Sequence, residues 1–376
     1  MSVKSESNKS KRKMIDIRTA DHQERALLVG LKIPTQTRQD AEELLVELAE
    51  LARSAGAVVV DSLLQQRKRP DPGTYIGKGL VKEIKTRLTE ENITLVIFDD
   101  PLSPAQQRNL ERAFEVKTLD RSRLILDIFA GRARTAEAMA QVELAQLQYL
   151  LPRLTRAWTH LSRQRSAIGA RGPGETQLET DRRRIHTRIS SLKKRLEKIV
   201  VQRAQRRKGR ESMLKVAFVG YTNAGKSTLF NKMTKATVEV RDRLFMTLDP
   251  TSRVMSQPYP TRVLFTDTVG FIRKLPHELI ESFKSTLEEA VLADVLVHVV
   301  DCSDESFLQK IEQTRKTLTE IGASAPALIV YNKIDLNPEF IPPPEITPQA
   351  EQICLSAQTG RGVPLLRELI IQRIST

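Results

Sequence analysis

The sequence contains only two cysteines, Cys302 and Cys354, among its 376 residues. Neither belongs to a CxxC pair or a His/Cys cluster, which argues against a disulfide framework and a zinc site. No apolar run reaches the roughly 18 to 20 residues that a membrane-spanning helix needs. The first residues, MSVKSESNKSKRKM, lack the apolar segment of a signal peptide. We therefore expect a cytoplasmic protein without membrane insertion, beginning with a disordered basic tail over residues 1–20.

Aromatic residues are also scarce, at 5% of the chain, whereas the formal net charge is +14. This charge is concentrated in residues 151–212, which contain 18 Lys+Arg against 5 Asp+Glu, while the segments on either side are close to neutral. A concentrated positive charge favours phosphate binding, because each neutralised phosphate releases counterions. With so much positive charge and so few aromatic side chains, any nucleic acid is expected to be recognised by shape and phosphate, without base-edge specificity. The alternative, a solvated helix surface, usually mixes both signs of charge.

A chain of this length exceeds what one hydrophobic core usually organises, so two or three domains are expected. Between residues 24 and 120, short β-branched runs such as ITLVIFDD alternate with helical stretches such as DAEELLVELAELARSAG. Apolar strands separated by amphipathic helices indicate a parallel sheet covered by helices. We assign residues 21–135 to a small N-terminal parallel α/β domain.

The middle of the chain has the spacing of a coiled coil. Apolar residues recur at alternating intervals of four and three before and after the loop GARGPG at 169–174. Two such seams joined by a Gly/Pro loop predict an antiparallel long-helix hairpin, a basic arm over residues 136–212 with a glycine-rich tip. The predicted RNA-binding residues are Arg163, Arg165, Arg171, Gly172, Gly174, Arg182, Arg183 and Arg184.

After residue 215 the pattern becomes strand, loop and helix, and the loop fits GxxxxGK[ST] in full. Glycines in this P-loop motif let backbone N–H groups surround phosphates, Lys226 reaches the β and γ phosphates, and the Ser227 hydroxyl ligates Mg²⁺. The predicted phosphate-binding residues are Gly220, Tyr221, Thr222, Asn223, Ala224, Gly225, Lys226, Ser227 and Thr228.

Three further motifs follow at the ends of apolar strands. Asp267, Thr268, Val269 and Gly270 form a DxxG motif, in which Asp267 would hold Mg²⁺ through water and the Gly270 N–H would sense the γ-phosphate. Asn332, Lys333 and Asp335 form NKID, and Ser356 with Ala357 would place an N–H near guanine O6. A carboxylate at Asp335 matches the N1–H and N2–H₂ donors of guanine, which adenine lacks as a pair. The order of these motifs predicts a GTP-binding, doubly wound P-loop domain over residues 213–376.

Between the first two motifs, Thr247 and Thr251 both qualify as the threonine that closes on Mg²⁺ and the γ-phosphate. We prefer Thr247, because Phe245 provides an aromatic anchor just before it. The predicted catalytic residues are thus Lys226, Thr247 and Gly270, and the predicted metal ligands are Ser227, Thr247 and Asp267. Phe271 stands where Ras-type enzymes carry a glutamine, so intrinsic hydrolysis is expected to be slow.

These motifs together resemble the HflX family of translation-associated GTPases. The resemblance rests on GPGETQLETDRR at 172–183, TYIGKG at 74–79, GYTNAGKSTLFN at 220–231, FMTLDPT at 245–251, DTVGFI at 267–272 and NKID. It implies an N-terminal α/β domain with a helical arm, a G domain, binding to the large ribosomal subunit and its RNA, and dissociation of stalled or idle ribosomes. A hydrophobic residue after DxxG is also typical of this family, which fits Phe271.

We therefore expect a monomeric, Mg²⁺-dependent GTPase whose hydrolysis the ribosome stimulates. Two other functions fit part of the sequence. One is a GTP-dependent RNA chaperone or helicase in ribosome assembly, and the other is a signalling GTPase whose arm binds a protein.

Overall fold

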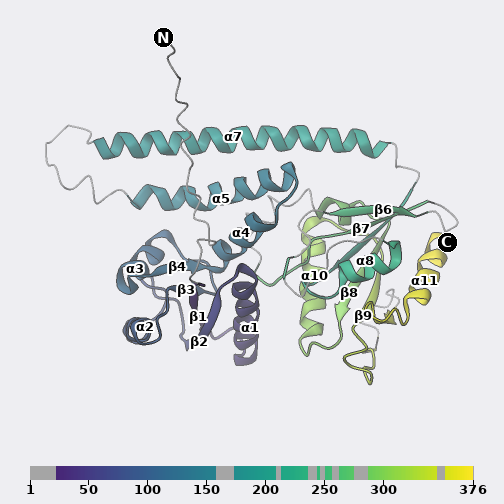
Figure 1. Ribbon diagram of the computed structural model, residues 1–376, viewed down its shortest axis with the longest axis horizontal. Coiled ribbons are helices and arrows are strands. Elements are labelled where there is room, and N and C mark those ends of the chain that lie inside the picture. Colours follow the sequence, from purple (N-terminus) through teal and green to yellow (C-terminus); the bar gives the residue numbers. More distant parts are fainter. Residues whose placement is uncertain are drawn as a thin grey trace, which may run out of the picture.

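In the computed structural model, the chain forms two sheets with helices on both faces and a pair of long helices beside them (Figure 1). The structure describes residues 23–157, 173–208, 213–235, 244–245, 250–255, 262–274, 287–344 and 352–375. Its elements are β1 (Arg25–Lys32), α1 (Arg38–Ala55), β2 (Val58–Gln66), α2 (Lys78–Glu90), β3 (Leu95–Phe98), α3 (Pro104–Phe114), β4 (Lys117–Asp120), α4 (Arg121–Arg132), α5 (Ala136–Ala157), α7 (Pro173–Lys208), β5 (Leu214–Gly220), α8 (Lys226–Thr234), β6 (Thr251–Met255), β7 (Val263–Asp267), β8 (Val295–Asp301), α10 (Phe307–Ile321), β9 (Ala327–Asn332), β10 (Gln352–Cys354) and α11 (Val363–Ser375).

The N-terminal sheet has four parallel strands in the order β2-β1-β3-β4. Side chains alternate across β1, so that Leu28 packs with α1 and α4 while Leu27 packs with α2 and α3. Burial on both faces explains why the strands read as continuous apolar runs. The prediction of a parallel sheet covered by helices is confirmed.

Local signals set the limits of α1. The Thr37 hydroxyl oxygen accepts from the Asp40 N–H at 3.0 Å, and the Asp40 carboxylate accepts from the Thr37 N–H. This reciprocal pair is a capping box. Gly56 ends the helix with φ of 97°, a conformation that favours glycine. These two caps set the limits of α1, whose Glu43 and Glu47 contact Arg273 and Tyr221 of the C-terminal domain.

The arm is an antiparallel pair of helices. Leu192 of α7 is buried against Ala140 and Leu144 of α5, as the coiled-coil spacing predicts. Arg188 and Arg203 of α7 pair with Glu143 and Glu137 of α5, so the two helices run in opposite directions. Gly174 lies in the first turn of α7 instead of in the tip loop, because Pro173, with its fixed φ, suits the start of a helix.

The C-terminal sheet has six strands in the order β10-β9-β8-β5-β7-β6, and only β6 runs antiparallel to its neighbour. The chain leaves β5 toward β6 and β7 on one side and returns to β8 on the other. This reversal makes β5 the switch point where a doubly wound sheet binds its ligand. Among the described residues, no helix combines the length and apolar character needed to cross a bilayer.

Candidate functional site

The GxxxxGK[ST] loop joins the carboxyl end of β5 to α8, as the sequence predicts. Gly220 has φ of 141°, and a Cβ there would lie 2.2 Å from the Val299 carbonyl oxygen of β8. Gly225 has φ of 92°, and a Cβ there would lie 2.1 Å from Asn332 Nδ2. Both glycines are therefore required by backbone conformation and by the close approach of β8 and β9.

The helix α8 begins directly at this loop. Its N-cap, Gly225, supplies no side-chain cap, so the N–H groups of the first turn are available to an anion. Lys226 is buried and donates from Nζ to the Tyr221 carbonyl oxygen at 2.7 Å, which folds the side chain back over the loop. Burial lowers the pKa of the Lys226 ammonium to about 8, against the opposing effect of Asp267. A buried cation next to a helix N-terminus is suited to a polyanionic ligand.

The predicted metal ligands Ser227 and Asp267 are brought together. Ser227 Oγ donates to Asp267 Oδ2 at 2.5 Å, and Asp267 is fully buried at the end of β7. A hydroxyl and a carboxylate are oxygen donors of the type that Mg²⁺ prefers. Gly270 lies against Lys226, because a Cβ at position 270 would be only 2.9 Å from Lys226 Nζ. Its backbone therefore reaches the phosphate side of the site.

The residues that follow Asp267 are held by the structure around them. Thr268 Oγ1 donates to the Phe218 carbonyl oxygen at 2.6 Å, so its side chain braces β5. Val269 and Phe271 are buried, and the Phe271 N–H donates to the Gly220 carbonyl oxygen at 3.1 Å. An apolar, buried Phe271 has no group with which to orient a water molecule.

The base side of the site gathers at the ends of β9 and β10. Asp335 is exposed, while Lys333 pairs with Asp301 at 2.6 Å. Asn332 is buried, and its side chain donates to the Ala224 carbonyl oxygen and accepts from the Ala357 N–H, both at 2.8 Å. Asn332 therefore ties the phosphate loop to the Ser356-Ala357 segment, a task that the motif alone does not reveal.

Several predicted residues lie outside the described part of the chain. Thr247 is among them, as are Arg163, Arg165, Arg171 and Gly172 of the predicted RNA-binding set. Thr251 begins β6, and Arg182 to Arg184 are exposed on α7. The preference for Thr247 over Thr251 stays a prediction.

An ionic network that the motifs did not predict joins the P-loop to the N-terminal domain. Tyr221 donates from its hydroxyl to Glu47 of α1 and accepts from the Arg273 N–H at 2.6 Å. Glu47 also pairs with Arg121, whose other nitrogen donates to Asp99 at 2.7 Å. The Arg121 side chain is 1% exposed, so its charge depends on both carboxylates. Burial raises the pKa of the Tyr221 hydroxyl, and Glu47 adds to the effect.

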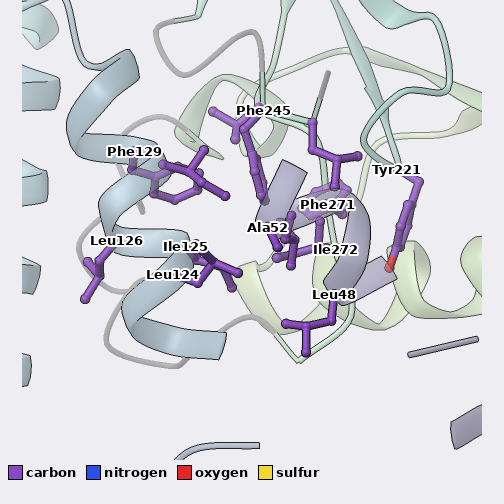
Figure 2. Packing of buried hydrophobic residues seen from close by; sticks show 14 of the residues in the cluster. Leu48, Ala52, Leu124, Ile125, Leu126, Phe129, Tyr221, Phe245, Phe271 and Ile272 are labelled. Atoms are coloured by element: carbon purple, nitrogen blue, oxygen red, sulfur yellow. The ribbon is translucent and has the colours of Figure 1, made fainter. Parts of the chain in front are cut away.

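A cluster of buried hydrophobic residues that includes Tyr221 also joins the two domains (Figure 2). Phe245 packs edge to face on Phe129 of α4 with ring centroids 4.7 Å apart. Phe271 and Ile272 pack in the same cluster as Leu48 of α1. Long-range contacts of this kind leave no local sequence signal. The segments on both sides of the phosphate site thus contact the N-terminal domain.

Comparison with protein families matches three consecutive parts of the chain. Residues 42–130 match the family described as GTP-binding GTPase N-terminal, and residues 132–210 match GTP-binding GTPase Middle Region. Residues 215–333 match the family described as 50S ribosome-binding GTPase.

Similar proteins span nearly the whole chain. The GTPase HflX of Lacrimispora saccharolytica is 48% identical over 351 residues, which are 93% of this chain and 82% of that protein. The GTPase HflX of Escherichia coli is 47% identical over 94% of this chain and 84% of its own. A crystal structure of SsGBP in complex with GDP aligns with a TM-score of 0.51 and 26% identity, covering 93% of this chain and 98% of that one. The chain therefore belongs to the HflX family of GTPases, and it binds and hydrolyses GTP.

Proposed function

We propose that this GTPase docks on the large ribosomal subunit in its GTP-bound state and dissociates stalled or idle ribosomes in the cytoplasm. The observation that carries the proposal is the charge of the arm. The arm is the most basic part of the chain, and it leads directly into a nearly neutral GTPase domain. The positive charge of the arm is complementary to the negative charge of ribosomal phosphates. The matched family description, 50S ribosome-binding GTPase, supports the same partner.

Each nucleotide-binding residue has a proposed task. Lys226 holds the β and γ phosphates, Gly270 contributes its N–H to the γ-phosphate, and Asp335 reads guanine. Ser227 and Asp267, already in contact, would hold Mg²⁺ together with Thr247. When bound, Mg²⁺ neutralises charge that develops on the phosphate oxygens during hydrolysis.

The hydrolytic step is proposed to need a contribution from the ribosome. Phe271 is buried in the position after DxxG, so this side chain cannot position the attacking water. A GTPase that lacks a side chain to orient the attacking water hydrolyses GTP slowly by itself. We expect contact with the ribosome to increase the rate of hydrolysis. Such an arrangement couples GTP hydrolysis to arrival at the correct particle.

Nucleotide binding is expected to take up a proton above pH 8. Burial lowers the pKa of Lys226 to about 8, and bound phosphates would raise it by stabilising the ammonium. At pH 8.5 the nucleotide-free protein should therefore acquire about three quarters of a proton per GTP bound. Titration calorimetry in two buffers of different ionisation enthalpy measures this uptake.

The control for this titration is Lys235→Ala, which removes an exposed lysine just after α8. It should leave the uptake unchanged. A wild-type protein that binds GTP at pH 8.5 without proton uptake would show that Lys226 is not the coupled group.

Ribosome splitting is tested by sedimentation. Purified 70S ribosomes are mixed with the protein and GTP, GDP or a non-hydrolysable GTP analogue, and the subunits are separated on a sucrose gradient. We expect the analogue to place the protein on the large subunit, and GTP or the analogue to shift the 70S peak toward free subunits. Binding only to precursor particles would favour an assembly factor, and the absence of binding in every nucleotide state would exclude the proposal.

A further inference from the structure

One hydroxyl of the phosphate loop is not used by the fold. Thr222 is 7% exposed, and its Oγ1 is buried without a hydrogen-bond partner among the residues that the structure describes. Thr268, which is also buried in the predicted site, by contrast donates from Oγ1 to the Phe218 carbonyl oxygen at 2.6 Å. A buried hydroxyl without a partner costs free energy, so a ligand that supplies an acceptor would remove that cost.

The backbone N–H of Thr222 is already engaged. It donates to the Phe271 carbonyl oxygen at 2.8 Å, and the Phe271 N–H donates to the Gly220 carbonyl oxygen. These two bonds form a parallel bridge between Tyr221 and Phe271, which joins the phosphate loop to the segment after DxxG. Because the Thr222 N–H has an acceptor within the protein, a contact between Thr222 and a phosphate would be made by its hydroxyl.

The Thr222 side chain lies beside the two residues that are proposed to bind the γ-phosphate. A Cβ at Gly270 would lie 2.8 Å from Thr222 Cγ2 and 2.9 Å from Lys226 Nζ. The Thr222 methyl group and the Lys226 ammonium are therefore both next to the Gly270 backbone. Because the methyl and the hydroxyl are attached to the same Cβ, a turn of about 120° about χ1 moves the hydroxyl into the place of the methyl. The hydroxyl is thus within one rotamer change of Lys226 and Gly270.

We infer that the Thr222 hydroxyl donates to an oxygen of the γ-phosphate and thereby makes the site prefer GTP over GDP. The inference rests on the proposed placement of the γ-phosphate beside Lys226 and Gly270, and it adds a specificity-determining side chain to that site. A threonine hydroxyl has one donor, which rotates to suit its acceptor, and a phosphate oxygen is such an acceptor. GDP has no γ-phosphate, so the hydroxyl contributes to the binding of GTP alone.

The test compares Thr222→Val, which keeps the branched shape and removes the hydroxyl, with Thr222→Ser, which keeps the hydroxyl and removes the methyl. Affinities of the full chain for a non-hydrolysable GTP analogue and for GDP are measured with Mg²⁺ by displacement of a fluorescent guanine nucleotide. We expect Thr222→Val to bind the analogue about 10-fold to 100-fold more weakly, because it loses one hydrogen bond to a charged group, and to bind GDP within about twofold of the wild type. Thr222→Ser should bind both nucleotides within about fivefold of the wild type.

The melting temperature separates this role from a structural one. Replacing an unpaired buried hydroxyl by a methyl group removes a desolvation cost, so nucleotide-free Thr222→Val should melt about 1–3 °C above the wild type. Thr314→Val is the matched control, because Thr314 Oγ1 of α10 is likewise buried with no partner in the described part of the chain and lies outside the phosphate loop. It should melt higher by a similar amount and leave both nucleotide affinities unchanged.

A third variant, Lys226→Ala, separates a failure of this inference from a failure of the proposed phosphate site. If Lys226→Ala retains wild-type affinity for both nucleotides, the proposed phosphate site is itself wrong. If Lys226→Ala loses affinity while Thr222→Val keeps the wild-type ratio of analogue affinity to GDP affinity, the Thr222 hydroxyl does not contact the γ-phosphate. An equal loss of both nucleotides in Thr222→Val, with a lowered melting temperature, would show a structural role of the side chain and would also overturn the inference.

Discussion

Replacing Asp335 by Asn is expected to lower GTP affinity about 100-fold to 1,000-fold. The Asp335 carboxylate is exposed three residues after β9, and its proposed role is to accept from both the N1–H and the N2–H₂ of guanine. Two hydrogen bonds to a charged group contribute about 1.5–3 kcal/mol each, and an amide preserves only part of this. Displacement of a fluorescent guanine nucleotide measures the change.

The same variant should gain affinity for xanthosine triphosphate, because xanthine carries a carbonyl where guanine has its 2-amino group and an amide N–H can donate to it. Glu339→Gln is the control, since Glu339 is an exposed acid in the same loop. It should leave all nucleotide affinities unchanged. Undiminished GTP binding by Asp335→Asn, or equal binding of ATP by the wild type, would contradict the proposed role of Asp335.

Replacing Glu47 by Ala is expected to destabilise the fold by about 3–5 kcal/mol, because it leaves Arg121 buried with half of its compensating charge. The Tyr221 hydroxyl also loses its acceptor. A loss of this size should lower the melting temperature by roughly 6–15 °C. Differential scanning calorimetry of the nucleotide-free protein provides the measurement.

A matched control lies on the same helix. Glu42 pairs with Arg38 at the surface, where the side chains are 54% and 81% exposed, and such pairs contribute about 0–1 kcal/mol. Glu42→Ala should therefore melt within a few degrees of the wild type. Glu47→Gln, which keeps the side-chain volume and one acceptor oxygen, should lie between them. If Glu47→Ala has the same melting temperature as Glu42→Ala, the ionic network does not stabilise the contact between the two domains.

Motifs with a fixed backbone requirement were predictable from the sequence. Gly220, Gly225 and Asp267 stand where strand, loop and helix succeed one another, so their positions follow from local pattern. The coiled-coil spacing similarly predicted that Leu192 faces α5. The element β4 was not predicted, because its sequence KTLD has no apolar run, unlike the LVIF of the equally short β3.

Contacts between segments far apart in the chain could not be predicted from the sequence. Glu47, Arg121 and Tyr221 are separated by 74 and 100 residues, and nothing near any of them marks the others as partners. The motif also did not indicate that the Asn332 amide lies between Ala224 and Ala357. Gly174 was placed in a loop because glycine favours turns, while Pro173 before it starts a helix.

The way in which α7 joins the GTPase domain has a mechanical consequence. Its 36 residues form a rod about 54 Å long, and only five residues separate Lys208 from the first residue of β5, the strand that leads into the phosphate loop. A rotation of about 5° at the Lys208 end would displace the Pro173 end by about 5 Å, given that length. Ångström-scale adjustments around the nucleotide would thus be amplified into nucleotide-sized movements at the far end of the rod.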